Sequence, residues 1–335
     1  MPINRRNFVS AFGMAALSSP LQSKSKAWTL EPDPAGKTLK TGDGQTIFTY
    51  LTRKPDNVPL AGNNACCFHP VNTISGERVT DIAPPDHRDH RGIFFAWGNM
   101  DFHRKNGDLR ADFWGWGHYA PTKGRLIVNR DVRLVKSNSK SAEVAVHNDW
   151  IIDGEKVLDE STNTRVHEKH GARILDFVFR FSSDGDVNID RMAFTGFVVR
   201  CRKDGQYYLS NSKGKVDLPD SNALKPEMNW PESDWYSHTI ALSSGKTVAT
   251  AVIDHPSNPR STWHEPRNVS FLNPCISALA PVTIPAGKEL TLRYRTVVHD
   301  GEFPNGLVDR LATEWRKTDN SAATVRERLP RPVIS

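Results

Sequence analysis

Four side chains that can move protons or bind anions follow two prolines in the first third of the chain. They are Asp86, His87, His90 and Arg91. Imidazole titrates near neutral pH, and a neighbouring carboxylate can orient it. We therefore predict His87 and His90 as acid–base residues, with Asp86 orienting the ring. The alternative is a hydrogen-bond network that only fixes the loop.

The same histidines are also candidate metal ligands. Imidazole and carboxylate groups bind zinc, iron or copper, and His69 precedes the loop on a separate strand segment. The second hypothesis is therefore one divalent metal ion held by His69, His87 and His90. The chain has no HExxH motif, so the local pattern specifies no metal.

Two later segments, 112–118 and 254–267, combine aromatic rings with Asp, His and Arg. Aromatic faces stack on the apolar faces of sugar rings, while polar side chains bond their hydroxyls. The alternatives are an aromatic core cluster for the first segment and a rigid turn for the second. The predicted substrate-binding residues are Arg91, Trp97, Asp112, Trp114, His255, Arg260, Trp263, His264 and Arg267.

Short apolar runs with alternating polarity, separated by turn residues, predict the elements that carry these side chains. The segment 177–181 alternates Phe with Val and Arg, and Ser183–Asp186 is a candidate turn. Leu307, Leu311 and Trp315 predict one helix. We expect a mainly β protein, a large antiparallel β-sandwich with few helices. Further strands are predicted at 126–128, 132–135, 143–147, 187–189, 197–200, 247–253 and 290–299.

The N-terminal residues 1–27 have a twin-arginine signal pattern with Arg5, Arg6 and a short apolar stretch. We expect export to the periplasm or beyond, with the Tat translocase as a partner and no stable membrane span. Residues 28–317 are predicted as one β-sandwich domain and residues 318–335 as a mobile tail. The four cysteines are too few for a disulfide framework.

The formal net charge of +6 gives little indication of nucleic-acid binding. The first 27 residues carry four basic side chains and no acid, so about +2 remains for the rest. We therefore expect no nucleic-acid partner.

Several motifs occur along the chain: His69-Pro70, Pro85-Asp86-His87 with His90-Arg91-Gly92, Asp112-Phe113-Trp114, His255-Pro256 with Trp263, and Leu292-Arg293-Tyr294-Arg295. Together they resemble a bacterial family of secreted proteins called methane oxygenase PmoA-like. This resemblance implies a β-supersandwich similar to galactose mutarotase-like sugar enzymes, and an association with glycan degradation. A particulate methane monooxygenase subunit spans the membrane several times, whereas this chain has no such span, so we do not predict methane oxidation.

Three functional hypotheses follow from these residues. The first is an exported enzyme that acts on a sugar or glycoside, with acid–base residues in a cleft lined by Trp and Arg. The second is a histidine-ligated metal enzyme. The third is a glycan-binding module without catalysis, which the aromatic content and the lack of a GxSxG elbow favour.

Overall fold

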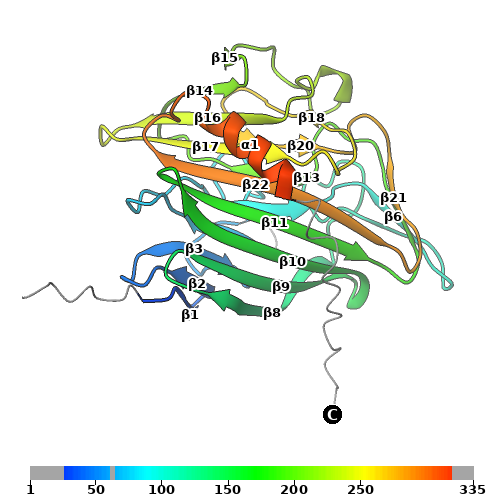
Figure 1. The fold of residues 1–335 in the computed structure, drawn as a ribbon. Coiled ribbons are helices and arrows are strands. Elements are labelled where there is room, and N and C mark those ends of the chain that lie inside the picture. The colour runs from blue at the N-terminus through cyan, green and yellow to red at the C-terminus, as the bar shows by residue number, and fades with distance from the viewer. Residues whose placement is uncertain (1–25, 61–64, 319–335) are drawn as a thin grey trace, which may run out of the picture.

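Two antiparallel sheets packed face to face form the body of the molecule in a computed structural model (Figure 1). The structure describes residues 26–60 and 65–318. Most of the predicted signal peptide, and all of the predicted tail except residue 318, lie outside these residues. The predicted fold class, a mainly β protein with antiparallel sheets and few helices, is confirmed.

The first sheet has seven strands and carries the N-terminal part of the chain. Its edge strand β19 comes from much later in the sequence, and so does β13 beside it. In sheet order the strands are β1 (Thr29–Asp33), β2 (Gly36–Lys40), β3 (Thr46–Leu51), β4 (Cys67–Val71), β5 (Ile93–Ala96), β13 (Gly196–Arg200) and β19 (Phe271–Leu272).

The second sheet has nine strands, several of them long, and includes most of the predicted strands. The segments predicted at 126–128 and 132–135 form one strand, β8, which has register shifts after Asn129 and Leu134. In sheet order the strands are β15 (Gly214–Val216), β14 (Gly205–Asn211), β16 (Trp235–Leu242), β17 (Thr247–Asp254), β22 (Glu289–Asp300), β11 (Ala172–Ser182), β10 (Glu155–Lys169), β9 (Ser141–Ile152) and β8 (Arg125–Ser137).

Two smaller sheets and two short helices complete the described elements. The α-helix is twelve residues long, and no described helix is long and apolar enough to cross a membrane. The elements are β21 (Val282–Ile284), β12 (Asp186–Ile189), β6 (Met100–His103) and β7 (Leu109–Ala111) in one sheet, β18 (Thr262–Trp263) and β20 (Pro274–Cys275) in the other, the 3-10 turn η1 (Pro226–Met228) and α1 (Leu307–Thr318).

The core lies between the two large sheets because alternate residues of each strand point inward. Phe68 of β4 meets Phe177 of β11, with ring centroids 5.2 Å apart. Phe197 of β13 stacks on Tyr294 of β22 at 4.4 Å. The four cysteines are free and buried, so this packing rather than a disulfide joins the sheets.

The opposite, outer face of the nine-stranded sheet is only partly covered. Helix α1 lies across it in Figure 1 and packs Leu307, Leu311 and Trp315 against β11, β17 and β22. The four-residue spacing that predicted the helix is therefore the spacing that docks it. Beyond the helix, this face carries polar side chains from β8, β9 and β10.

Candidate functional site

The loop 84–92 enters β5 through a tightly constrained turn. The Ala83 amide donates to the His90 carbonyl at 2.8 Å. Gly92 has φ 54°, and a Cβ at this position would lie 2.2 Å from the Phe68 carbonyl oxygen. Only glycine fits there without displacing β4, so the backbone fixes where the loop side chains point.

A buried arginine gathers the ionisable side chains of this loop. Arg200, at the end of β13, is fully buried and donates to both carboxylate oxygens of Asp86 at 3.1 and 2.9 Å. Its guanidinium also lies 3.2 Å from His90 Nδ1. The His87 ring stacks on His90 at 4.5 Å, and Lys203 Nζ lies 3.2 Å from Asp86 Oδ2. We call these five residues the loop cluster.

These contacts determine which imidazole nitrogens can accept a proton. Arginine can only donate, so His90 Nδ1 accepts and the proton of neutral His90 is on Nε2, 4.0 Å from Asp89 Oδ2. Asp86 accepts from His87 Nδ1 at 3.2 Å. The second nitrogen of His87, Nε2, is then the free base, as in a catalytic pair whose carboxylate holds the imidazole tautomer.

The pKa values of the two neighbouring aspartates are shifted in opposite directions, because only Asp86 is bound by Arg200. Partial burial acts to raise the pKa of Asp86, but the hydrogen bonds and charge of Arg200 outweigh it and hold that pKa well below its usual range. Burial raises the pKa of Asp89, and burial lowers the pKa of His90 well below its usual value. The loop cluster and the adjacent Asp89 thus combine a firmly ionised carboxylate, a carboxyl that retains its proton more readily, and a neutral buried imidazole.

Aromatic rings surround the buried side of the cluster. Trp114 meets His90 edge-on at 5.7 Å, and Phe271 of β19 stacks on it at 5.3 Å. Phe194 packs against both Trp114 and Trp116, at 5.1 Å in each case. Trp116 is 37% exposed, whereas Trp114 is buried, so the ring available for stacking is Trp116.

Among the predicted substrate-binding residues of segment 254–267, His264 lies beside the aromatic rings around the loop cluster. Its ring lies 5.2 Å from Phe194 and 5.8 Å from Phe271, and its Nδ1 lies 2.9 Å from Asn229 Oδ1. Burial, with a smaller contribution from His87, lowers the pKa of His264 to about 3. His264 is therefore a neutral neighbour of the loop cluster.

Asp112 and Arg91 lie near the cluster but support its structure. Asp112 is buried and accepts from the amides of Gly115 and Gly117 at 2.8 and 2.5 Å, which closes the turn that presents the aromatic loop. Arg91 is buried, donates to the Asp89 carbonyl at 3.0 Å and covers the Phe94 ring. Because both side chains are buried, the structure does not support the prediction that they contact a ligand.

Like Trp114, the other two tryptophans predicted to bind substrate belong to the core, and all three rings are buried. Trp97 is fully buried against Phe95 and Trp150, with ring centroids 4.7 and 5.5 Å away. Trp263 is fully buried and packs on Tyr236 at 5.0 Å. Large apolar rings on strands of a two-sheet protein fill the space between the sheets, so neither ring lines a cleft.

The remaining predicted residues of segment 254–267 are dispersed. His255 packs its ring on Trp315 of α1 at 4.8 Å. Arg260 is exposed and paired with Glu232, and Arg267 is exposed with its Nε 3.3 Å from Asp220. The structure does not bring these three side chains to the loop cluster.

The comparisons with known proteins assign a family. The model of a family of unknown function, DUF6807, matches residues 38–313, which is most of the chain. The chain belongs to DUF6807. No curated protein matches it.

Solved structures with similar backbones share little sequence with this DUF6807 member. A galactose mutarotase related enzyme from Lactobacillus acidophilus is 9% identical, with a TM-score of 0.37, and the match covers 82% of this chain and 100% of that one. A galactose mutarotase-like protein from Lactobacillus casei is 9% identical, with a TM-score of 0.35, covering 81% and 100%. An alpha-galactosidase from Geobacillus stearothermophilus is 8% identical, with a TM-score of 0.41, covering 82% of this chain and 41% of that one.

The predicted metal ligands His69, His87 and His90 do not form a ligand set. His69 Nδ1 lies 3.0 Å from Thr80 Oγ1, and burial lowers the pKa of His69 to about 3. His90 Nδ1 faces the Arg200 guanidinium, which disfavours a second cation. Within residues 26–60 and 65–318, the one group of three whose ligand atoms lie within 4.8 Å of one another is elsewhere.

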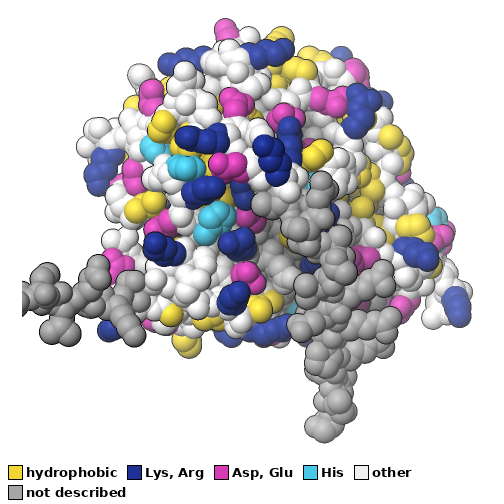
Figure 2. All heavy atoms as spheres, in the orientation of Figure 1, with side chains coloured by type: hydrophobic (Ala, Val, Ile, Leu, Met, Phe, Trp, Pro, Cys, Tyr) yellow, Lys and Arg dark blue, Asp and Glu magenta, His cyan; other side chains and the backbone are white. Residues whose placement is uncertain are grey.

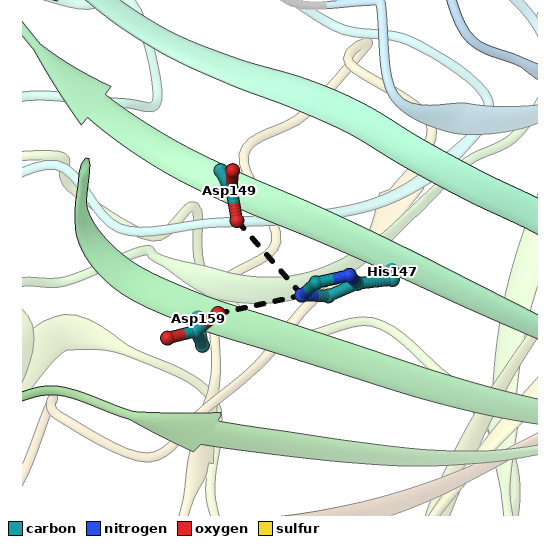
Figure 3. Close-up of side chains that lie close together, drawn as sticks. All are labelled: His147, Asp149 and Asp159. Atoms are coloured by element: carbon teal, nitrogen blue, oxygen red, sulfur yellow. Dashed lines mark hydrogen bonds and ion pairs between the residues drawn. The ribbon is translucent and has the colours of Figure 1, made fainter. Parts of the chain in front are cut away.

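That group, which we call the sheet-face cluster, consists of His147, Asp149 and Asp159 (Figure 3). The first two residues are on β9 and the third is on β10, and all three point to the outer face of the nine-stranded sheet. His147 Nε2 lies 3.3 Å from Asp159 Oδ1 and 3.8 Å from Asp149 Oδ1. The cluster lies in no segment that the sequence motifs singled out.

A groove of about 620 Å³ lies on the same outer face, beside α1. Figure 2 shows basic, acidic and histidine side chains gathered on this face. Asp176 and Arg295 pair within the groove at 2.5 Å, and His167 lies beside them. None of the predicted catalytic residues lines it, so groove and loop cluster are separate places.

Three residues of the site were not predicted from the sequence: Arg200, Lys203 and Trp116. Arg200 ends a correctly predicted strand, but its partners Asp86 and His90 are more than a hundred residues away in sequence. No local pattern reports such a pairing. Trp116 lay within a segment that was singled out, and its flanking glycines were the available signal for an exposed turn.

Proposed function

We propose that this protein is an exported carbohydrate-active enzyme that performs acid–base chemistry on a sugar or glycoside at the loop cluster. The observation that carries the proposal is His87. Its side chain is accessible, its Nδ1 is bound to an aspartate kept ionised by buried Arg200, and no described residue occupies its Nε2. Export rests on the N-terminal sequence pattern.

In this proposal, His87 Nε2 takes a proton from a substrate hydroxyl or water, and Asp86 stabilises the imidazolium that results. Asp89, with its raised pKa, is the candidate proton donor. Trp116 supplies a stacking face, and the partly exposed Lys203 is placed to contact substrate oxygens. His90 and Arg200 act as positioning residues.

The test is turnover of a panel of reducing sugars, glycosides and sugar acids, followed by NMR of the anomeric protons, which detects hydrolysis, epimerisation and elimination alike. We expect His87→Ala to lower turnover by about 10²–10⁴-fold with ligand binding retained. The matched control is His103→Ala, which removes another exposed histidine that pairs with an aspartate.

Unchanged turnover in His87→Ala would rule out its catalytic role. Sugar binding without any product, in the unmodified protein, would instead favour the glycan-binding module.

A further inference from the structure

The sheet-face cluster contains two like charges at a position where they repel. Asp149 and Asp159 are directly paired across β9 and β10, on the outer face of the sheet. Like charges at opposed positions of an antiparallel pair are destabilising. This position therefore favours a cation between the two carboxylates.

The geometry of the three side chains approaches that of a metal site. Zinc binds imidazole nitrogen and carboxylate oxygen at about 2.0–2.2 Å, which places neighbouring tetrahedral ligands about 3.4 Å apart. His147 Nε2 already lies 3.3 and 3.8 Å from the two carboxylate oxygens, and Figure 3 shows both carboxylates directed at that nitrogen. Small side-chain rotations would bring all three to one ion.

One ligand atom is buried without a hydrogen bond. Asp149 is 8% exposed, and its Oδ1 has no hydrogen-bond partner. An unsatisfied buried carboxylate oxygen costs free energy that a bound cation would recover. Arg130 donates only to the other oxygen, Oδ2, at 2.6 Å, so Oδ1 is available.

A lysine ammonium lies close to both carboxylates of the cluster. Lys156 Nζ lies 2.8 and 3.0 Å from the oxygens of Asp159 and 3.8 Å from Asp149 Oδ1. Its side chain is 47% exposed and sits on a flexible four-carbon stem, so it can move into solvent. The lysine is a replaceable counter-ion, unlike Arg130.

We propose that His147, Asp149 and Asp159 bind one divalent transition-metal ion of the zinc type, and that Lys156 holds this position when the metal is absent. Three protein ligands on an open sheet face leave a further coordination position for water or a ligand oxygen. The site is separate from the loop cluster and does not depend on its proposed function.

The test is a zinc titration of the full chain, purified without a histidine tag and stripped with chelator, with competition against a coloured chelator. We expect one zinc per chain, binding at least tenfold weaker in His147→Ala, and unchanged binding in the control His103→Ala. Lys156→Met should bind several-fold more tightly, because it removes the competing ammonium.

If His147→Ala is unstable, Lys156→Met still tests the site, since a gain of zinc affinity requires a folded sheet. Absence of stoichiometric zinc in the unmodified protein, equal affinity in His147→Ala, or weaker binding in Lys156→Met would each overturn the proposal.

Discussion

The loop cluster and the sheet-face cluster each place an imidazole nitrogen close to an aspartate, at 3.2 Å for His87 and 3.3 Å for His147, but they differ in the cation beside it. Arg200 is fully buried and binds both oxygens of Asp86. Lys156 is half exposed and reaches its carboxylates from the surface. A buried cation therefore keeps its aspartate bound within the protein, whereas an exposed cation can move away and leave its aspartate free to bind an added ligand.

The largest expected effect is the loss of the buried cation. Arg200→Met removes the buried partner of Asp86, which keeps only His87 and Lys203, and should lower the free energy of unfolding by about 1.5–3 kcal/mol. Lys156→Met should change that free energy by no more than about 1 kcal/mol, because the pair is exposed. Urea denaturation measures both. If both variants lowered the free energy of unfolding equally, the two clusters would not differ in the way proposed.

The pKa values of the histidines in the two clusters should also be shifted in opposite directions. In chelator-treated protein, the hydrogen bond to Asp159 raises the pKa of His147, so this pair adds stability below about pH 6.5 and loses it as pH rises through the folded pKa. Burial lowers the pKa of His90 and that of His264, so stability falls as pH drops below about 6.5, where the unfolded chain gains protons.

NMR of the imidazole protons between pH 5 and 8 checks this difference, in the range where a free histidine titrates at about 6.5. His147 should titrate above the free value, whereas His90 and His264 should not titrate. A His90 titration near the free value would show that burial and the Arg200 contact do not hold it neutral.

A smaller effect is expected at the exposed aromatic ring. Trp116→Ala should weaken sugar binding about tenfold, which corresponds to about 1.4 kcal/mol, since it removes the stacking face. The free energy of unfolding should change little because the ring is partly exposed. Calorimetric titration measures the affinity, and unchanged affinity would exclude Trp116 from the site.

Alternation and helical spacing predicted the fold class because both reflect burial on one face. The segment around Phe177–Phe181 and the helix at Leu307 were predicted from that signal and are present as β11 and α1. The same signal could not assign Trp97 or Trp263 to a cleft or a core, because an apolar ring satisfies either environment until the opposing sheet is known.

The candidate site was predicted only in part, for a related reason. The loop around His87 was visible because its chemistry is contiguous in sequence. Arg200, which sets the tautomers and charges of that loop, comes from a distant strand. In the sheet-face cluster, only His147 lay in a predicted strand segment, 143–147. The strand that carries Asp159, β10, was not predicted, so no sequence pattern indicated convergence between β9 and β10.

The most direct test of the central claim is an isotope-edited NMR titration of the full protein with a sugar that it binds or turns over. Binding at the loop cluster predicts shifts of the Trp116 indole N–H and the His87 ring protons, with the His147 and His167 rings unchanged. Shifts confined to His167 and the groove on the outer sheet face, with His87 and Trp116 unaffected, would contradict it.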